Sequence, residues 1–314
     1  MSLQSYFEMP ANVTRQLNPF RLVRGTLEAA DALETTVTHH ELDLRDMECG
    51  YTIETPQKLR SKSAVVVAGG FCALELSYSD LRNQLATTDE RRVVTLSPPQ
   101  FTLKGYIQAL RNGTYSTLQS NHLIAVMDDV QKRYNIPAFD FVGHSLGGRT
   151  IGNAVQTETK KCGKQSHIKS ATFVATAGGD GSNLFDLAKR APRFFLGEFK
   201  DDLPDITRGL RKDKKTALKQ AQRYYGNPAE VALEGIAASS YDILPDLITM
   251  RKYGVATGAV LPDKDSLFSS TRSIDSLAMN LGAWQEMEGD HNAPIVEPEK
   301  TAVALRSVWE QLGR

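Results

Sequence analysis

Cysteine is scarce in this chain of 314 residues. Its three cysteines, Cys49, Cys72 and Cys162, include no CxxC pair and show no spacing typical of a zinc site. Such an odd and sparse set favours a reducing compartment and argues against a disulfide framework. We therefore expect no structural metal and no cofactor.

Long apolar runs and an excess of charge are also missing. The sequence has no apolar stretch of membrane-spanning length, and its first residues contain no apolar run long enough for a signal peptide. The 37 Lys and Arg residues balance the 37 Asp and Glu residues, so the composition does not indicate a nucleic-acid partner. We expect a cytoplasmic protein without membrane insertion, and the sequence makes no prediction of its oligomeric state.

Strand and helix patterns alternate along most of the chain. Residues 63–71 form a continuous apolar run typical of a strand buried on both faces, and residues 121–134 have helical periodicity. Alternation of this kind predicts βαβ units and a parallel sheet. The other predicted strands are residues 35–44, 50–55, 92–97, 139–142, 168–175, 255–261 and 281–287, and the other predicted helices are residues 19–33, 75–85 and 297–312.

Two predictions concern the borders of this pattern. Residues 35–44 and 50–55 look like half-exposed strands, which favours an antiparallel pair at a sheet edge. Residues 97–100, which contain Pro98 and Pro99, are expected to end the strand that begins at Arg92.

The stretch around Ser145 carries the clearest chemical signal. A short strand rich in aromatic and β-branched residues runs into Gly-x-Ser-x-Gly at residues 143–147, and a plausible helix follows. A serine on a sharp strand-to-helix turn has a strained backbone, and its glycine neighbours let the strand and the helix approach each other. The serine hydroxyl is then held clear of the backbone. The next N–H, that of Leu146, lies at a helix N-terminus, where it can stabilise an oxyanion.

These residues resemble the α/β-hydrolase superfamily, in particular its lipase- and esterase-like members, which often carry Gly-His-Ser-x-Gly-Gly. The resemblance covers about residue 35 to the end of the chain. It implies a mostly parallel eight-stranded sheet flanked by helices, with Ser145 as the nucleophile and a helical cap inserted after the sixth strand. His144, beside the nucleophile, is expected to pack near the site and to help bind substrate, with a role as the base as the weaker alternative.

The same resemblance implies a second oxyanion donor after the strand at residues 63–71. That strand ends in Gly69 and Gly70, but no histidine precedes the glycines as it often does in the family. We assign the donor to the backbone N–H of Phe71, with Cys72 as the alternative one residue on, and we expect Gly70 to border the substrate.

The remaining catalytic residues are also implied by the resemblance. The family places its acid after the seventh strand and its histidine after the last strand, often in a Gly-x-His setting. Asp265, followed by Ser266, Leu267 and Phe268, fits the acid, and His291 fits the histidine. Asp263 on the same loop and Asp180, after the sixth strand, are alternative acids. The order Ser145, Asp265, His291 is the order of the family.

Residues 183–250 depart from the βαβ rhythm and are helical in pattern with proline breaks. We assign residues 1–182 to the first part of the core, with an arm at 1–34, residues 183–250 to a cap, and residues 251–314 to the rest of the core. A basic run at residues 208–223 is interpreted as a solvated helix face, with anionic substrates or membranes as the alternative. The apolar residues expected in an acyl pocket are Phe185, Phe194, Phe195, Leu196 and Ile236.

We therefore expect a serine hydrolase that cleaves a small carboxylic ester through an acyl-enzyme intermediate. The same three residues would also suit a thioesterase, a lactonase, a C–C bond hydrolase or an acyltransferase, and a cofactor-free peroxidase side activity is a further alternative. Enzymes of this fold with an aspartate nucleophile are disfavoured by Ser145. A non-catalytic binding protein on the same fold is the alternative from a different class.

Overall fold

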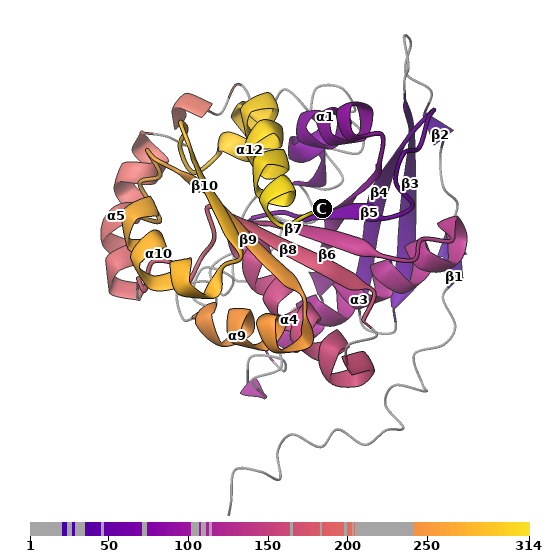
Figure 1. Cartoon of the computed structure of the whole chain (residues 1–314), viewed down its shortest axis with the longest axis horizontal. Helices are drawn as coiled ribbons and strands as arrows, with labels where there is room; N and C mark the ends of the chain where they lie inside the picture. Colours follow the sequence, from indigo (N-terminus) through magenta and orange to yellow (C-terminus); the bar gives the residue numbers. More distant parts are fainter. Residues whose placement is uncertain are drawn as a thin grey trace, which may run out of the picture.

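The computed structural model describes the chain at residues 21–23, 27–28, 35–44, 47–70, 74–101, 107, 111–112, 115–163, 166–182, 184–197, 200–202, 204 and 241–314. A single sheet with helices on both faces forms the centre of the molecule (Figure 1). Within these described residues, no helix has the length and apolar character needed to cross a bilayer.

The sheet has ten strands in the described part of the chain, in the order β1-β3-β4-β6-β5-β7-β8-β9-β10, with β2 also paired to β3. The strands from β6 to β10 along this order run parallel, whereas β1 to β4 pair antiparallel. The bounds are β1 Arg21–Val23, β2 Leu27–Glu28, β3 Thr35–Leu44, β4 Met47–Pro56, β5 Ala64–Ala68, β6 Arg92–Phe101, β7 Phe139–His144, β8 Ile168–Val174, β9 Ala256–Pro262 and β10 Ala283–Met287. The eight strands from β3 to β10 correspond to the eight predicted from the sequence.

Two helical layers cover the sheet. The helices α1 and α12 pack on one face, and α3, α4 and α9 pack on the other (Figure 1). The bounds are η2 Glu75–Tyr78, α1 Ser79–Asp89, α3 Tyr115–Tyr134, α4 Leu146–Cys162, α5 Leu184–Leu196, α9 Leu244–Tyr253, α10 Ser270–Leu277, η4 Ala278–Asn280, α11 Ala293–Val296 and α12 Pro298–Gln311.

Alternation along the central strands explains why β5 is apolar throughout. Val65 and Val67 pack with Leu85 and Leu305 under α1 and α12, whereas Val66 packs with residues of α3 and α4. Successive strand side chains point to opposite faces, so a strand covered on both sides needs apolar residues at every position. All five residues of β5 are buried.

The helix predicted for residues 19–33 is wrong in the part that the structure describes. Residues 21–23 and 27–28 are strands instead, and both pair antiparallel with β3. The ten-residue strand β3 would otherwise leave a row of unpaired backbone groups at the edge of the sheet. The pairing with that edge outweighs the weak helical spacing of the apolar residues.

The strand end predicted at residues 97–100 is also wrong, because β6 continues through Pro98 and Pro99 to Phe101. Strand β5 pairs with β6 only as far as Thr95, and the register with β4 shifts between Glu48 and Gly50. The prolines therefore lie beyond the parallel partner and beside an irregularity, where a missing N–H costs little.

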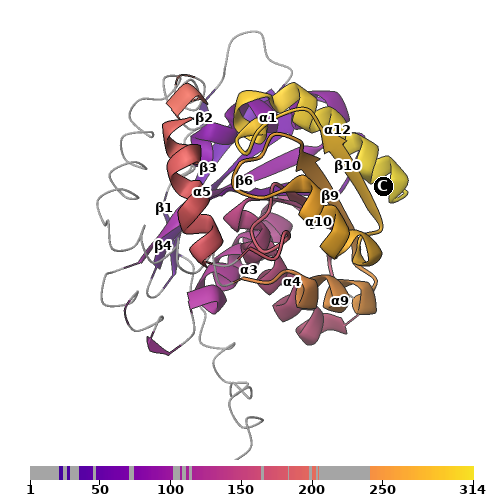
Figure 2. The same cartoon turned by 90° about the vertical axis from the view of Figure 1, so that its left-hand side faces the viewer.

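The segment expected to form a cap is described in part. Its helix α5 lies at the left of the molecule in Figure 1 and faces the viewer in Figure 2, while residues 205–240, with the basic run and Ile236, lie outside the described residues. At the other end of the segment, α9 packs against α4 and buries Leu247 and Met250 in the core. Residues 244–250 are thus part of a core layer.

The chain order and the parallel strands bring three loops to one edge of the sheet. Ser145 directly follows β7, Asp265 follows β9, and His291 follows β10. Because these strands run parallel, their carboxyl ends meet at the same edge, where ligands bind in sheets of this kind.

Candidate active site

Ser145 connects β7 to α4 and has a backbone conformation that is rare for a residue with a side chain. Its φ is 54° and its ψ is −121°. Three donors hold its carbonyl oxygen: the Thr176 hydroxyl at 3.0 Å, the Gly148 N–H at 3.1 Å and the Ala177 N–H at 3.3 Å. Its own N–H donates to Val174 in β8. Neighbouring backbone therefore fixes the strained turn on both sides.

The glycines of the turn are required by close packing. A Cβ on Gly143 would lie 2.7 Å from the Cα of Gly148, which confirms that the strand and the helix need a glycine here to approach each other. A Cβ on Gly147 would lie only 2.1 Å from the carbonyl oxygen of Ala68. The second glycine therefore makes room for the end of β5, a contact that the pentapeptide pattern does not reveal.

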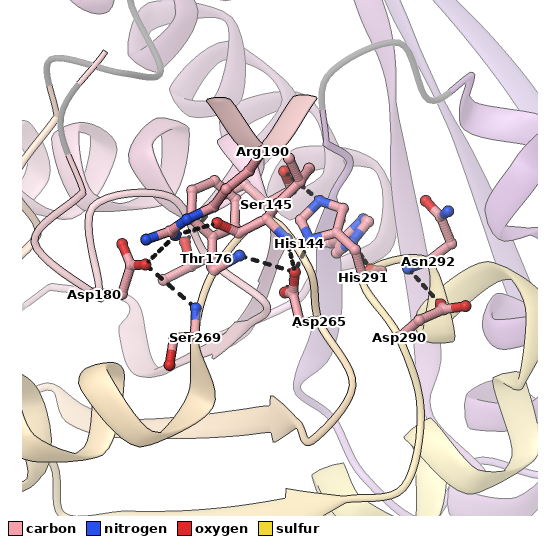
Figure 3. Close-up of polar contacts among 12 residues, drawn as sticks. His144, Ser145, Thr176, Asp180, Arg190, Asp265, Ser269, Asp290, His291 and Asn292 are labelled. Atoms are coloured by element: carbon pink, nitrogen blue, oxygen red, sulfur yellow. Dashed lines mark hydrogen bonds and ion pairs between the residues drawn. The ribbon is translucent and has the colours of Figure 1, made fainter. Parts of the chain in front are cut away.

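His291 lies between Ser145 and Asp265, and Figure 3 draws all three side chains. Its Nε2 is 3.0 Å from the Ser145 hydroxyl oxygen, and its Nδ1 is 3.0 Å from Oδ2 of Asp265. The other carboxylate oxygen of Asp265 accepts the N–H groups of Leu267 and Phe268 at 2.8 and 2.9 Å. The side chains of His291 and Asp265 are 5% and 1% exposed, so this hydrogen-bonded chain is shielded from bulk water.

The two alternative acids have other partners. Asp263 accepts the Gly289 N–H at 3.0 Å and so connects the loop after β9 to the loop that carries His291. Asp180 accepts hydrogen bonds from Arg190 at 2.8 Å and from the Ser269 N–H at 3.2 Å. Although burial acts to raise the pKa of Asp180, its hydrogen bonds to Ser182, Arg190 and Ser269 outweigh it and lower the pKa. Both carboxylates have contacts that suit structural roles.

The oxyanion donors can be placed in part. Leu146 is the first residue of α4, so its N–H has no acceptor within the helix and lies next to the nucleophile. Phe71 and Cys72 lie outside the described residues. The chain just before them is close to the nucleophile, because a Cβ on Gly70 would lie 2.8 Å from the Cβ of Ser145.

The comparisons with known proteins bear on the fold. A family described as an alpha/beta hydrolase of unknown function (DUF915) matches residues 105–162, which include Ser145. Among solved structures, a cold-adapted esterase from an Arctic intertidal metagenomic library is 13% identical, with 91% of this chain and 98% of that chain covered and a TM-score of 0.54. A lipase-esterase related protein from Clostridium acetobutylicum ATCC 824 is 14% identical, with coverages of 83% and 99% and a TM-score of 0.53.

A third similar structure is a bromoperoxidase from Bacillus anthracis, with 13% identity, coverages of 91% and 100%, and a TM-score of 0.52. The search of curated proteins found no match. At such low identities the similarity defines the fold. The chain has the α/β-hydrolase fold.

Aromatic rings from two segments lie against the candidate histidine of the site. Phe194 of α5 and Phe268 of the loop after β9 each have their ring centre 5.4 Å from that of His291. Both phenylalanines are buried. Two other residues expected in an acyl pocket, Phe185 and Leu196, are 68% and 77% exposed among the described residues, and the side chain of Phe195 lies outside them.

Polar contacts made by three residues near the site, Arg190, Asp202 and His144, were not predicted from the sequence. Arg190 of α5 binds the Asp180 carboxylate (Figure 3). It also donates to the Leu267 carbonyl at 2.6 Å, which attaches α5 to the loop of Asp265. Asp202 accepts the Asn292 side-chain amide at 2.8 Å, beside His291. The Arg190–Leu267 and Asp202–Asn292 pairs join residues 77 and 90 positions apart, and no local pattern signals them.

His144 makes two further contacts that the sequence did not predict. Its Nδ1 is 2.6 Å from the Tyr78 hydroxyl and its Nε2 is 2.8 Å from the His291 carbonyl oxygen. Burial, followed by the nearby His291, lowers the pKa of His144 to about 3. Both ring nitrogens have protein partners, so the interpretation of His144 as a packing residue fits this arrangement better than a polar contact with substrate.

Proposed function

We propose that the chain is a serine hydrolase that cleaves carboxylic esters through an acyl-enzyme intermediate. The observation that carries this proposal is the 3.0 Å contact between His291 Nε2 and the Ser145 hydroxyl, with Asp265 on the opposite ring nitrogen. A serine hydroxyl is a weak nucleophile by itself, and a base within hydrogen-bond reach activates it.

In the first half of the reaction, Ser145 Oγ attacks the ester carbonyl carbon while its proton moves to His291 Nε2. The carbonyl oxygen becomes an oxyanion, which the N–H of Leu146 is positioned to stabilise, with the N–H of Phe71 proposed as the second donor. A preformed donor of this kind contributes on the order of 3 kcal/mol. The tetrahedral intermediate then collapses, and His291 gives its proton to the alcohol as the C–O bond breaks.

In the second half, a water molecule replaces the alcohol. It gives a proton to His291 and attacks the acyl carbon, and His291 returns the proton to Ser145 as the acid leaves. Asp265 accepts the Nδ1–H throughout, so it holds the tautomer that leaves Nε2 free to act as a base, and it stabilises the imidazolium. The Leu267 and Phe268 N–H groups keep the carboxylate in this orientation.

Helix α5 supports the assignment of a cap over the site. Its Phe194 contacts His291, and its Arg190 is attached to the loop of Asp265. We propose that residues 183–240 form the cap and that Phe194 and Phe195 border the acyl group. Such a cap would exclude water from the imidazole and strengthen the electrostatic contacts at the nucleophile.

An ester is the first substrate class to test because an alcohol leaves easily once His291 protonates it. The panel consists of p-nitrophenyl esters from C2 to C12, a thioester and a lactone with matched acyl chains, each run with wild type and with Ser145→Ala. Ser170→Ala is the control, since this buried serine lies at the start of β8, at the other end of the strands.

We expect turnover of at least one ester by wild type and by Ser170→Ala, with a burst of p-nitrophenol equal to the enzyme concentration if deacylation is slow. Ser145→Ala should lower kcat by a factor of about 10⁶, because the nucleophile and its base act as a unit. Hydrolysis that survives in Ser145→Ala would overturn the proposal. Turnover of the thioester or the lactone alone would replace the ester with that substrate class.

A further inference from the structure

Four groups close to Ser145 are linked by a continuous row of hydrogen bonds, here called the hydrogen-bonded chain. The Gly70 N–H donates to the Tyr78 hydroxyl oxygen at 2.9 Å, and that hydroxyl lies 2.6 Å from Nδ1 of His144. On the far side of the ring, Nε2 of His144 lies 2.8 Å from the His291 carbonyl oxygen. The side chains of Tyr78 and His144 are buried, and neither is part of the proposed proton transfer.

The ends of this chain and the burial of the His144 ring together determine the position of its protons. A carbonyl oxygen can only accept, so Nε2 of His144 must carry a hydrogen. An amide N–H can only donate, so the Tyr78 oxygen accepts from Gly70. The His144 ring is buried, and this burial lowers its pKa to about 3, so the ring is neutral and Nδ1 carries no hydrogen. Nδ1 therefore accepts the Tyr78 hydrogen.

The hydrogen-bonded chain connects two segments whose relative position matters for the proposed reaction. Gly70 lies directly before Phe71, and a Cβ on it would lie 2.8 Å from the Cβ of Ser145. His291 supplies the base. Between them lie more than 200 positions of sequence, and the Tyr78 hydroxyl and the His144 ring bridge them through one residue of η2 and one of β7.

We propose that Tyr78 and His144 are positioning residues that hold the loop after β5 at Gly70, here called the oxyanion loop, and the main chain of His291 at fixed places relative to Ser145. This inference rests on the proposed serine-hydrolase function. The hydrogen bonds of the two side chains go to the Gly70 N–H, to each other and to the His291 carbonyl, and the ring centres of His144 and His291 lie 5.1 Å apart. The two side chains keep Gly70 and His291 in place when negative charge develops on the substrate oxygen, and small misplacements at such a site are costly.

The sharpest variant is Tyr78→Phe, because it removes a single oxygen and keeps the ring. It leaves the Gly70 N–H and the His144 Nδ1 without their partner. We expect kcat per active site, titrated with an organophosphonate, to fall about 10- to 100-fold while KM changes less than threefold. Binding of a trifluoromethyl ketone, whose adduct with serine resembles the tetrahedral intermediate, should weaken by the same factor.

Tyr51→Phe is the matched control. The Tyr51 hydroxyl is equally buried and donates to Asp129 at 2.6 Å. It lies in β4 and is not part of the hydrogen-bonded chain of Tyr78 and His144. It should lower the melting temperature as Tyr78→Phe does and leave kcat per titrated site unchanged. Equal kcat in wild type and Tyr78→Phe would overturn the proposal.

A second pair of variants tests whether the Tyr78 and His144 hydrogen bonds act as one connected unit or as separate contacts. His144→Phe removes both hydrogen bonds of the ring, whereas His144→Gln retains an acceptor and a donor and should recover part of kcat. The double variant Tyr78→Phe/His144→Phe should be no slower than His144→Phe alone, because one break already interrupts the chain. Fully additive losses of kcat in the double variant would contradict the idea that the hydrogen bonds act as one unit.

An NMR measurement tests the chain without any substrate. Long-range ¹H–¹⁵N spectra of the histidine rings should show His144 as the neutral Nε2–H tautomer from pH 8 down to pH 5, with Tyr78 and His291 as the groups that face it. A protonated ring or the Nδ1–H tautomer would overturn the inference. If wild type hydrolyses no substrate, the proposed function fails, and this spectrum still decides whether the chain exists.

Discussion

Ser145 and its two proposed partners are held in place by different means. Main-chain packing dominates at Ser145: two main-chain N–H groups and the Thr176 hydroxyl donate to its carbonyl oxygen, and glycines on both sides let neighbouring segments approach closely. Asp265 and His291 lie on loops that main-chain bonds join at two places, and side-chain hydrogen bonds add to these. Asp263 binds the Gly289 N–H, Arg190 binds the Leu267 carbonyl, and His144 binds the His291 carbonyl.

This difference determines in which part of the site a substitution can lower activity without unfolding the protein. A strained turn that is held by main-chain packing tolerates almost no added volume, so changes there should act on folding and activity together. A loop that is held by several side-chain hydrogen bonds can lose one of them and remain folded. Variants on the loop side should therefore separate activity from stability.

The largest expected effect is on the loop side. Asp265→Asn should lower kcat by about 10⁴ with little change in the melting temperature, because an amide cannot hold the required histidine tautomer. Steady-state kinetics of ester hydrolysis measure this. Asp263→Asn is the control, since an amide oxygen can still accept the Gly289 N–H, and it should retain most of the activity. A greater loss for Asp263→Asn than for Asp265→Asn would move the acid to the other carboxylate.

The next effect tests the turn. Gly147→Ala places a methyl group against the main chain of Ala68, so β5 and the oxyanion loop must shift. We expect labelling by an organophosphonate to slow by about 100-fold, together with a loss of stability of about 1–3 kcal/mol. Gly179→Ala should be tolerated, because the nearest atom to its Cβ would be a side-chain methyl of Leu277 at 3.2 Å. Similar behaviour of the two variants would show that the turn is not tightly packed.

A smaller effect is expected at α5. Phe194→Ala removes a buried ring beside His291, and the space should admit a longer acyl chain. Because a pocket discriminates by roughly 1–3 kcal/mol per methylene, the preferred chain length should shift by a factor of about ten in kcat/KM. Phe185→Ala is the control on the exposed side of the same helix. An unchanged ester profile for Phe194→Ala would mean that the ring packs α5 and does not border the substrate.

The smallest effect is on the pH dependence of stability. Burial, followed by the neighbouring His291, lowers the pKa of His144 to about 3 in the folded protein, below its ordinary value of 6.5. The unfolded chain therefore binds more protons between these values, and stability rises with pH up to about 6.5. His144→Gln should flatten that rise by up to roughly 1.4 kcal/mol per pH unit, measured by urea unfolding from pH 4.5 to 6. An identical slope in the variant would contradict a buried neutral ring.

The turn could be predicted from the sequence and the contacts of the loops could not, because only the turn is formed by residues adjacent in sequence. The strand, glycines and serine of the turn are adjacent, so their spacing alone signals the geometry, and apolar runs locate the central strands. The N-terminal strands were missed because pairing with the free edge of β3 decides their structure, and Pro98 looks like a strand end until the neighbouring register is known.

The contacts that hold the loops have no local signal. Tyr78 lies in an ordinary helical pattern, and Asp180 and Arg190 are charged residues with nothing to distinguish them before folding. Only the three-dimensional structure brings Arg190 to Leu267 and Tyr78 to His144. The candidate catalytic residues could be named because the family resemblance implies them, whereas the residues that contact them depend on this chain alone.

Labelling with a fluorophosphonate can decide whether Ser145 is the activated nucleophile of this site. The folded protein is treated with the reagent and then examined by intact-mass measurement and peptide mapping. We expect one adduct per chain, located on Ser145, and a labelling rate that falls sharply in Asp265→Asn. An adduct on another serine, or no adduct on the folded protein, would show that Ser145 is not the activated nucleophile.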